Sequence, residues 1–139
     1  MKIVVGGSMS FAKDQWKIGE KLKKKGYDIL YSDNIEEYLS RPIMKSSYEE
    51  ELESCLRHDI IKSFFNKIAQ ADNYLIVNNE KKGIRGYLGA SVIMEIGVAY
   101  HLNKKIFLLN PIDKSQSYAL EIDIIKPTIL NGNLTKIKE

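Results

Sequence analysis

Five short runs of apolar residues, many of them β-branched or aromatic, recur along the chain between glycine, proline and polar residues. Runs of this length and composition are typical of β-strands. Each run is followed by a turn-forming or charged segment, which ends the strand. The predicted strands are Lys2–Val5, Tyr27–Tyr31, Tyr74–Val77, Lys105–Leu109 and Thr128–Leu130.

Between these runs the apolar residues recur at helical spacing. One helix is predicted over Phe11–Lys25, a buried one over Ala90–Leu102, and a short one over Tyr118–Ile124. Apolar residues that step by four predict a single long amphipathic helix over Tyr48–Ala71, packed on the sheet. The residues that make this step are Leu52, Leu56, Ile60, Phe64 and Ile68.

The alternation of strands and helices predicts an α/β fold, in which a parallel sheet carries helices on both faces. We expect one domain, residues 1–139, with a doubly wound sheet of about five strands in the flavodoxin-like or Rossmann-like order 2-1-3-4-5. In that order the loops after the first and third strands meet at the switch point, where such sheets bind ligands. Ser8 and Glu95 are therefore expected at one crevice.

Composition narrows the class of protein. A chain of 139 residues can bury a core without metals or disulfides, and a net charge of +3 is too mild to indicate a nucleic-acid partner. The basic run Lys21–Lys25 lacks interleaved aromatic residues, so a solvated helix face is expected. The single cysteine, Cys55, is expected to be a buried small hydrophobe. With neither a signal-peptide pattern nor a membrane-spanning run, the sequence predicts a soluble cytoplasmic protein.

The stretch Gly83–Tyr100 carries the chemistry. Three glycines spaced three apart, Gly83, Gly86 and Gly89, lead from the third strand into an apolar helix that contains one carboxylate, Glu95. A charge among apolar neighbours is costly unless it is paired or functional. The alternative is a glutamate that caps the helix or pairs with a lysine at its edge. A glycine-rich loop before a helix N-terminus suits an anionic ligand such as a phosphate.

These motifs resemble the nucleoside 2-deoxyribosyltransferase superfamily, which includes the deoxynucleoside 5′-monophosphate N-glycosidases. The resemblance is carried by the strand Leu75-Ile-Val-Asn78, the glycine-rich loop and the helix segment Met94-Glu-Ile-Gly-Val-Ala99. It extends to Lys2–Met9, similar to that family's first strand and substrate loop, and to Lys104–Pro111 as the next strand. The segment Asp33–Arg57 lies outside it.

The resemblance implies cleavage or transfer of an N-glycosidic bond in a nucleoside or a (deoxy)nucleoside 5′-monophosphate. Glu95 is then the nucleophile on C1′, since a carboxylate can stabilise or attack an oxocarbenium-like carbon. Asp59 is a candidate proton donor or base contact, although family members carry their aspartate closer to the third strand. No cofactor or metal is implied. Relatives complete each site with a neighbouring subunit, so a homodimer or larger homo-oligomer is expected.

The other candidate substrate-binding residues lie in the loops after the first and third strands. Ser8 could bind a phosphate or sugar, or cap a helix; the two asparagines could bind substrate or form a turn. At Gly89 transferases of the family carry an acidic residue and hydrolases a phosphate-binding serine, which Ser91 could replace at a shifted position. The whole set is Gly7, Ser8, Met9, Asn78, Asn79, Gly86, Gly89 and Ser91.

Two rival interpretations remain open at the level of sequence. The chain could be a non-catalytic nucleotide-binding or regulatory module on the same fold, because fold does not determine function. It could also be a structural protein whose apolar helix, with Gly97 and Ala99, forms a dimer surface. A buried Glu95 that faces the first loop favours the enzyme, whereas a Glu95 paired with lysine favours the module. The segment Asn34–Ser47 is either a lid or a surface excursion, and His58 is expected on the surface.

Overall fold

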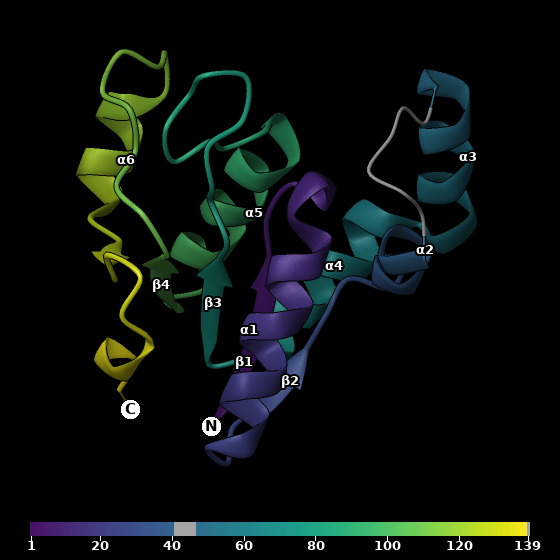
Figure 1. Cartoon of the computed structure of the whole chain (residues 1–139). Helices are drawn as coiled ribbons and strands as arrows, with labels where there is room; N and C mark the ends of the chain where they lie inside the picture. Colours follow the sequence, from purple (N-terminus) through teal and green to yellow (C-terminus); the bar gives the residue numbers. More distant parts are fainter. Residues whose placement is uncertain (41–46, 139) are drawn as a thin grey trace.

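The computed structural model describes residues 1–40 and 47–138. Its centre is a parallel five-stranded sheet in the order β2-β1-β3-β4-β5, which confirms the predicted fold class and strand order (Figure 1). The strands are β1 Lys2–Gly6, β2 Asp28–Leu30, β3 Asn73–Ile76, β4 Lys105–Leu108 and β5 Thr128–Ile129.

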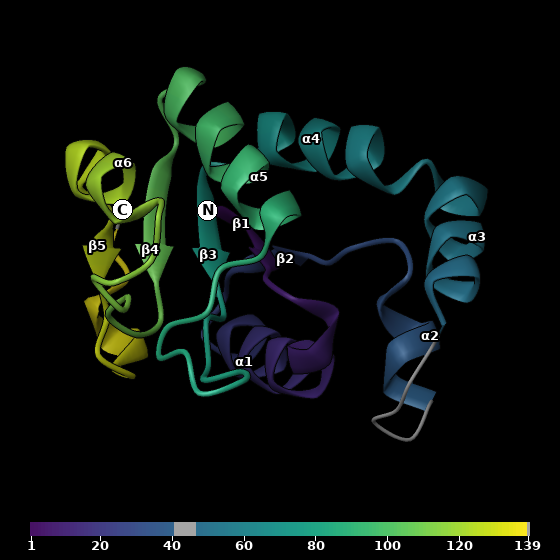
Figure 2. The same cartoon turned by 90° about the horizontal axis from the view of Figure 1, so that it is seen from above.

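Helices cover both faces of the sheet (Figure 2). Helices α4, α5 and α6 pack on one face, and α1 with the C-terminal segment packs on the other. Side chains of β3 alternate between these layers, so that Tyr74 faces α4 and α5 while Leu75 faces α1. The helices are η1 Met9–Phe11, α1 Ala12–Lys24, α2 Ile35–Ser40, α3 Tyr48–His58, α4 Ile60–Gln70, α5 Ala90–His101, α6 Ala119–Ile125 and η2 Leu134–Lys136.

The prediction of one long helix over Tyr48–Ala71 is wrong. The chain breaks at Asp59, whose φ of 44° is left-handed, so α3 ends there and α4 begins at Ile60. Helix α4 packs on the sheet as expected, but α3 stands at the far end of the molecule (Figures 1 and 2). Leu52 and Leu56 of α3 are consequently 43% and 71% exposed. Neither side chain belongs to the hydrophobic core that the described residues form.

The expectation that α5 is buried is correct for one face only. Val92, Ile96 and Ala99 are buried in the core, whereas Met94 and Tyr100 are 46% and 52% exposed. Because Ala99 faces the core, it cannot serve the dimer surface considered as an alternative for this helix, although Gly97 is exposed. The apolar composition of α5 reflects a core face plus separate apolar residues that are exposed.

The segment Asn34–Ser47 begins with α2 and then passes out of the described residues at 41–46, which include Ile43 and Met44. Helix α2 is tied to α3 through Glu37, whose carboxylate accepts hydrogen bonds from Ser54 Oγ at 2.6 Å and His58 Nε2 at 2.7 Å. The two helices therefore form one unit beside the sheet. None of the helices in residues 1–40 and 47–138 is long and apolar enough to cross a membrane.

Candidate active site

A pocket of about 520 Å³ opens beyond the carboxyl end of β1, at the point where the strand order reverses. Its volume lies in the range of roughly 300–1,000 Å³ that is typical of small-molecule sites. The lining comes from the loop after β1, from α2, α3 and α4, from the loop after β3, and from the first turns of α5. Ser8 and Glu95 both line it, so the topology brings these two distant residues to one crevice.

Glu95 lines this pocket from the second turn of α5. Its Oε1 accepts a 2.6 Å hydrogen bond from the hydroxyl of Tyr74, and Oε2 accepts none from any described residue. Burial raises the pKa of Glu95 to about 7, although the Tyr74 hydrogen bond acts in the opposite direction. Within the described ranges no lysine, arginine or histidine forms an ion pair with this carboxylate. The acid thus keeps its proton to a higher pH than an exposed glutamate does, and one of its oxygens is available to a ligand.

Tyr74 positions the Glu95 carboxylate through the hydrogen bond that its hydroxyl donates. Its side chain is completely buried and packs edge-on against Phe64, with ring centroids 5.6 Å apart. Burial, followed by the nearby Glu95, raises the pKa of Tyr74 far above its usual range, so the phenol remains a donor. At Gly6 a Cβ would lie 2.7 Å from the Phe64 ring and 2.9 Å from the Tyr74 hydroxyl. The absence of a side chain at Gly6 therefore makes room for the donor.

Replacing Tyr74 by phenylalanine is expected to raise the pKa of Glu95 above about 7. The hydrogen bond favours the carboxylate over the neutral acid, so its loss favours the proton, while the phenyl ring keeps the packing against Phe64. The titration of the Glu95 carboxyl carbon can be followed by NMR. Tyr31→Phe is a matched control, because that hydroxyl donates to Glu20 elsewhere. An unchanged Glu95 pKa in Tyr74→Phe would contradict the assignment.

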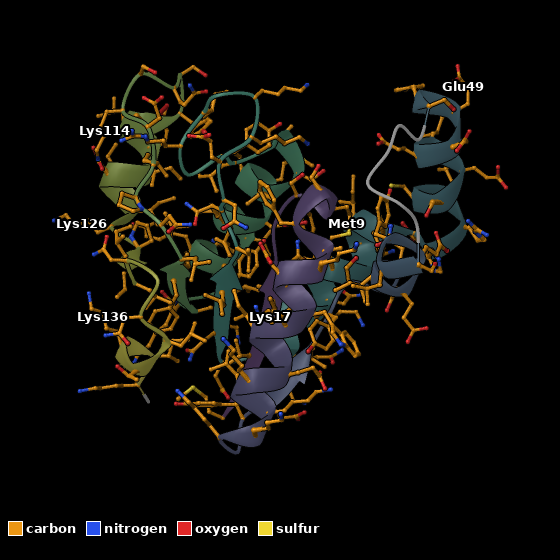
Figure 3. The ribbon with its side chains drawn as sticks, viewed as in Figure 1. Met9, Lys17, Glu49, Lys114, Lys126 and Lys136 are labelled. Carbon is orange, nitrogen blue, oxygen red and sulfur yellow. The ribbon has the colours of Figure 1, made fainter. Side chains whose placement is uncertain are left out.

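The loop after β1 forms another side of the pocket. Gly7 has a φ of 135°, and a Cβ there would lie 2.5 Å from the Val77 carbonyl oxygen, so only glycine fits. The Ser8 hydroxyl caps η1 by accepting from the Ser10 amide at 3.3 Å, so the capping alternative is realised, and Ser8 nevertheless lines the pocket. Met9, the first residue of η1, also lines it, on the side of the molecule towards α2 and α3 (Figure 3).

Lys81 is a lining residue that the sequence analysis missed. Its ammonium donates to Ser8 Oγ at 3.2 Å and lies 5.0 Å from the centroid of the Tyr87 ring. The polar run Glu80-Lys81-Lys82 is typical of a solvated turn, so the sequence carried no signal that one of its lysines points inward. Lys13, from the first turn of α1, adds a second positive charge to the lining.

The N-cap residue Gly89 and the first turn of α5, through Ala90, Ser91 and Val92, supply further lining. Gly89 is the N-cap residue, so unpaired backbone N–H groups of the helix start at this edge of the pocket. Cys55, which was expected to be buried, is only partly buried and lines the pocket from α3. Burial raises the pKa of its thiol, so the neutral form is favoured.

The structure does not bring Asn78 and Asn79 into the pocket lining. Asn78 is fully buried and pairs with Asn110, receiving its amide N–H at 2.9 Å and donating to its carbonyl at 2.7 Å. Asn79 donates to the Asp14 carboxylate at 2.6 Å. Both amides therefore tie together the loops that follow β3 and β4 and the start of α1, which agrees with their turn-forming alternative.

Gly86 and Asp59 also lie outside the pocket lining. Gly86 has a φ of 61°, and a Cβ there would lie 2.0 Å from the carbonyl oxygen of Pro111, so the close approach is to the chain itself. Asp59 is exposed at the junction of α3 and α4. Among the described residues, no group of three or more histidine, cysteine, aspartate or glutamate side chains could hold a metal ion.

Comparison with known proteins gives similarity at the level of the backbone. No family model and no curated protein matches the sequence. Among solved structures, the CMP N-glycosidase BcmB of Clostridium botulinum is 14% identical, with a TM-score of 0.46 over 93% of this chain and 85% of that one. A 2-desoxiribosyltransferase from Leishmania mexicana is 14% identical, with a TM-score of 0.43 over 78% of this chain and 65% of that one.

Both names fall within the superfamily that the sequence motifs resemble. This chain spans less than two thirds of the Leishmania protein. At 14% identity and with TM-scores below 0.5, neither likeness assigns an activity to this chain. Its chemistry has to follow from its own residues.

Proposed function

We propose that this protein is an enzyme that cleaves or transfers the N-glycosidic bond of a nucleoside or nucleoside 5′-monophosphate, with Glu95 as the nucleophile. The observation that carries the proposal is the environment of Glu95, a mostly buried carboxylate that lines a substrate-sized pocket, receives a hydrogen bond from Tyr74 and has no cation partner among the described residues. A structural glutamate would be expected to pair with a cation or to face solvent. The resemblance of the motifs around Glu95 supports the same reading.

The chemistry follows from the two carboxylate oxygens. Tyr74 engages Oε1, and Oε2 attacks C1′ of the sugar as the bond to the base breaks and its electrons pass to the base nitrogen. The resulting glycosyl ester is resolved by water, which releases the free sugar, or by a second base, which forms a new N-glycosidic bond. Because Asp59 lies outside the lining, we do not assign it the donation of a proton to the departing base.

The test is the release of free base, measured by chromatography, from a panel of nucleosides, deoxynucleosides and their 5′-monophosphates. Each substrate is incubated with and without a second base, which separates hydrolysis from transfer. We expect release from at least one member of the panel. If no member releases base, while nucleotides still raise the melting temperature, the chain is a non-catalytic nucleotide-binding module instead.

We also propose that the chain forms a homodimer through α3. Tyr48, Leu52 and Leu56 follow one another at intervals of four and are 74%, 43% and 71% exposed, so they form an apolar row that the described part of the chain leaves exposed. A second copy of α3 would cover it. The same helix lines the pocket, so association would take place beside the site.

Light scattering is expected to give the wild-type protein a mass near twice 15.9 kDa. Leu56→Asp introduces a charge into the apolar row and is expected to give a monomer that remains folded, because Leu56 makes little contribution to the core. Glu53→Ala, an exposed change on the same helix, is the control and should remain dimeric. A monomeric wild type would overturn the proposal.

A further inference from the structure

The loop after β3 holds one ammonium group in a fixed position inside the pocket. Lys81 and Ile84 form an antiparallel bridge, with Lys81 N donating to Ile84 O at 3.1 Å and Ile84 N to Lys81 O at 2.9 Å. The two residues between them, Lys82 and Gly83, both have positive φ, of 53° and 75°, as a type I′ turn requires. This tight hairpin turn fixes the backbone from which the Lys81 side chain reaches the pocket.

The ammonium of Lys81 lies among groups that suit an anion. It donates to Ser8 Oγ at 3.2 Å and lies over the ring of Tyr87. The start of α5 lies next to the same ring. A Cβ built on Gly89, the N-cap residue of α5, would lie 3.6 Å from the Tyr87 ring. A lysine, a serine hydroxyl and a helix N-terminus are thus gathered around one ring. Lys13 lines the same pocket.

Lys81 forms no direct ion pair with a carboxylate among the described residues, although it is one of the pocket-lining lysines. Lys2, Lys23, Lys67 and Lys114 each form an ion pair with an aspartate or glutamate, whereas Lys81 forms none with any described residue. Burial, followed by the charge of Lys82, lowers the pKa of Lys81, although the carboxylate of Glu51, which also lines the pocket, acts in the opposite direction. A partly desolvated cation without a paired anion is stabilised when an anionic ligand binds.

We propose that Lys81, with Ser8 and the start of α5, binds the phosphate group of a phosphate monoester, and that the substrate is therefore a nucleoside 5′-monophosphate rather than a free nucleoside. This inference rests on the proposed function for the identity of the rest of the substrate. The phosphate subsite itself stands on the geometry of the lining. Lysine serves here as a point charge, and the serine hydroxyl and helix amides supply hydrogen-bond donors to the phosphate oxygens.

The test compares kcat/KM for a nucleoside 5′-monophosphate with that for the matching nucleoside. The wild type is expected to prefer the monophosphate, and Lys81→Met, which keeps the length of the side chain over Tyr87 but removes its charge, is expected to reduce that preference about 10- to 100-fold. Lys81→Arg keeps the charge and should retain most of it. Lys17→Met removes a lysine from the exposed face of α1, outside the lining, and is the control (Figure 3).

A binding measurement separates failure of this inference from failure of the proposed function. Millimolar inorganic phosphate is expected to raise the melting temperature of the wild type and of Lys17→Met, but not that of Lys81→Met. If no substrate releases base but this difference is seen, the glycosidic reaction is wrong and the phosphate subsite stands. Equal kcat/KM for nucleoside and monophosphate, or a preference unchanged in Lys81→Met, overturns the inference. If the free nucleoside reacts only when inorganic phosphate is added, the subsite holds a phosphate co-substrate and the 5′-monophosphate assignment is wrong.

Discussion

Glu95→Gln is expected to lower kcat/KM for base release by at least about 10³-fold, because a neutral amide cannot attack C1′ or stabilise positive charge there. A factor of 10³ corresponds to about 4 kcal/mol of transition-state stabilisation. Glutamine has the shape of glutamate, and its side-chain oxygen can still accept the hydrogen bond from Tyr74, which is 2.6 Å long in the wild type. The loss would therefore report the missing charge and nucleophile rather than a collapsed pocket.

The measurement is initial-rate release of free base from the best substrate of the panel. Glu121→Gln is a matched control, since this glutamate is exposed on α6, away from the pocket, and its amide should leave the rate within about twofold. Full turnover by Glu95→Gln would remove Glu95 from the mechanism. The proposed reaction would then have no nucleophile among the residues of the pocket that we assign.

The same substitution is expected to stabilise the folded protein at alkaline pH. Burial raises the pKa of Glu95 from 4.5 to about 7, so between these values the folded state holds a proton that the unfolded state has lost. The free energy of unfolding of the wild type therefore falls as pH rises from about 4.5 to 7, by about 3 kcal/mol in total. Glutamine does not ionise, so the free energy of unfolding of Glu95→Gln does not contain this pH-dependent decrease.

Denaturant titrations near pH 5 and near pH 8 can measure the effect. Near pH 8 the variant is expected to be more stable than the wild type by up to about 3 kcal/mol, and near pH 5 the difference should be small, because most of the folded wild type is then protonated. A difference that does not change with pH would show that Glu95 is not the titrating group. Loss of activity together with a gain in stability is the pattern expected of a carboxylate kept in the pocket for chemistry.

The fold could be predicted because its determinants are local. The apolar run from Lys2 to Val5 and its counterparts are too short for helices, and their alternation with helical segments allows few sheet orders. Glu95 could be found for a related reason, since one carboxylate within an apolar helix has an energetic cost that the sequence alone reveals. The crevice then followed from the switch point between β1 and β3.

The break at Asp59 could not be predicted, because the apolar step of four continues through it. Leu56 and Ile60 keep the spacing of one helix, yet a single left-handed residue, with a φ of 44°, separates them. Asp is among the few non-glycine residues that adopt this conformation at modest cost. Periodicity reports which residues are apolar, not what covers them, so the spacing predicts a core face for side chains that are exposed on α3.

The roles of the remaining site residues depend on contacts between distant segments. Nothing local distinguishes Lys81 from Lys82, or indicates that Gly6 leaves room for the hydroxyl of Tyr74 on the neighbouring strand. In the same way, the sequence places Gly86 in a predicted ligand-binding loop. The structure requires a glycine there because the Pro111 carbonyl oxygen leaves no space for a Cβ. Such roles follow from register and loop packing, which are properties of the assembled fold.

Helix α3 has one side in the pocket and another in the exposed apolar row, and this arrangement bears on how ligand binding and self-association affect each other. Cys55 lines the pocket while its neighbour Leu56 lies in the exposed apolar row, so one short helix belongs to both surfaces. If a second copy covers that row and thereby changes the affinity of the pocket, ligand binding and self-association are linked, and the coupling is reciprocal. A nucleotide that binds more tightly to the dimer must strengthen the dimer by the same factor. The concentration of the protein would then help to set its apparent affinity for substrate.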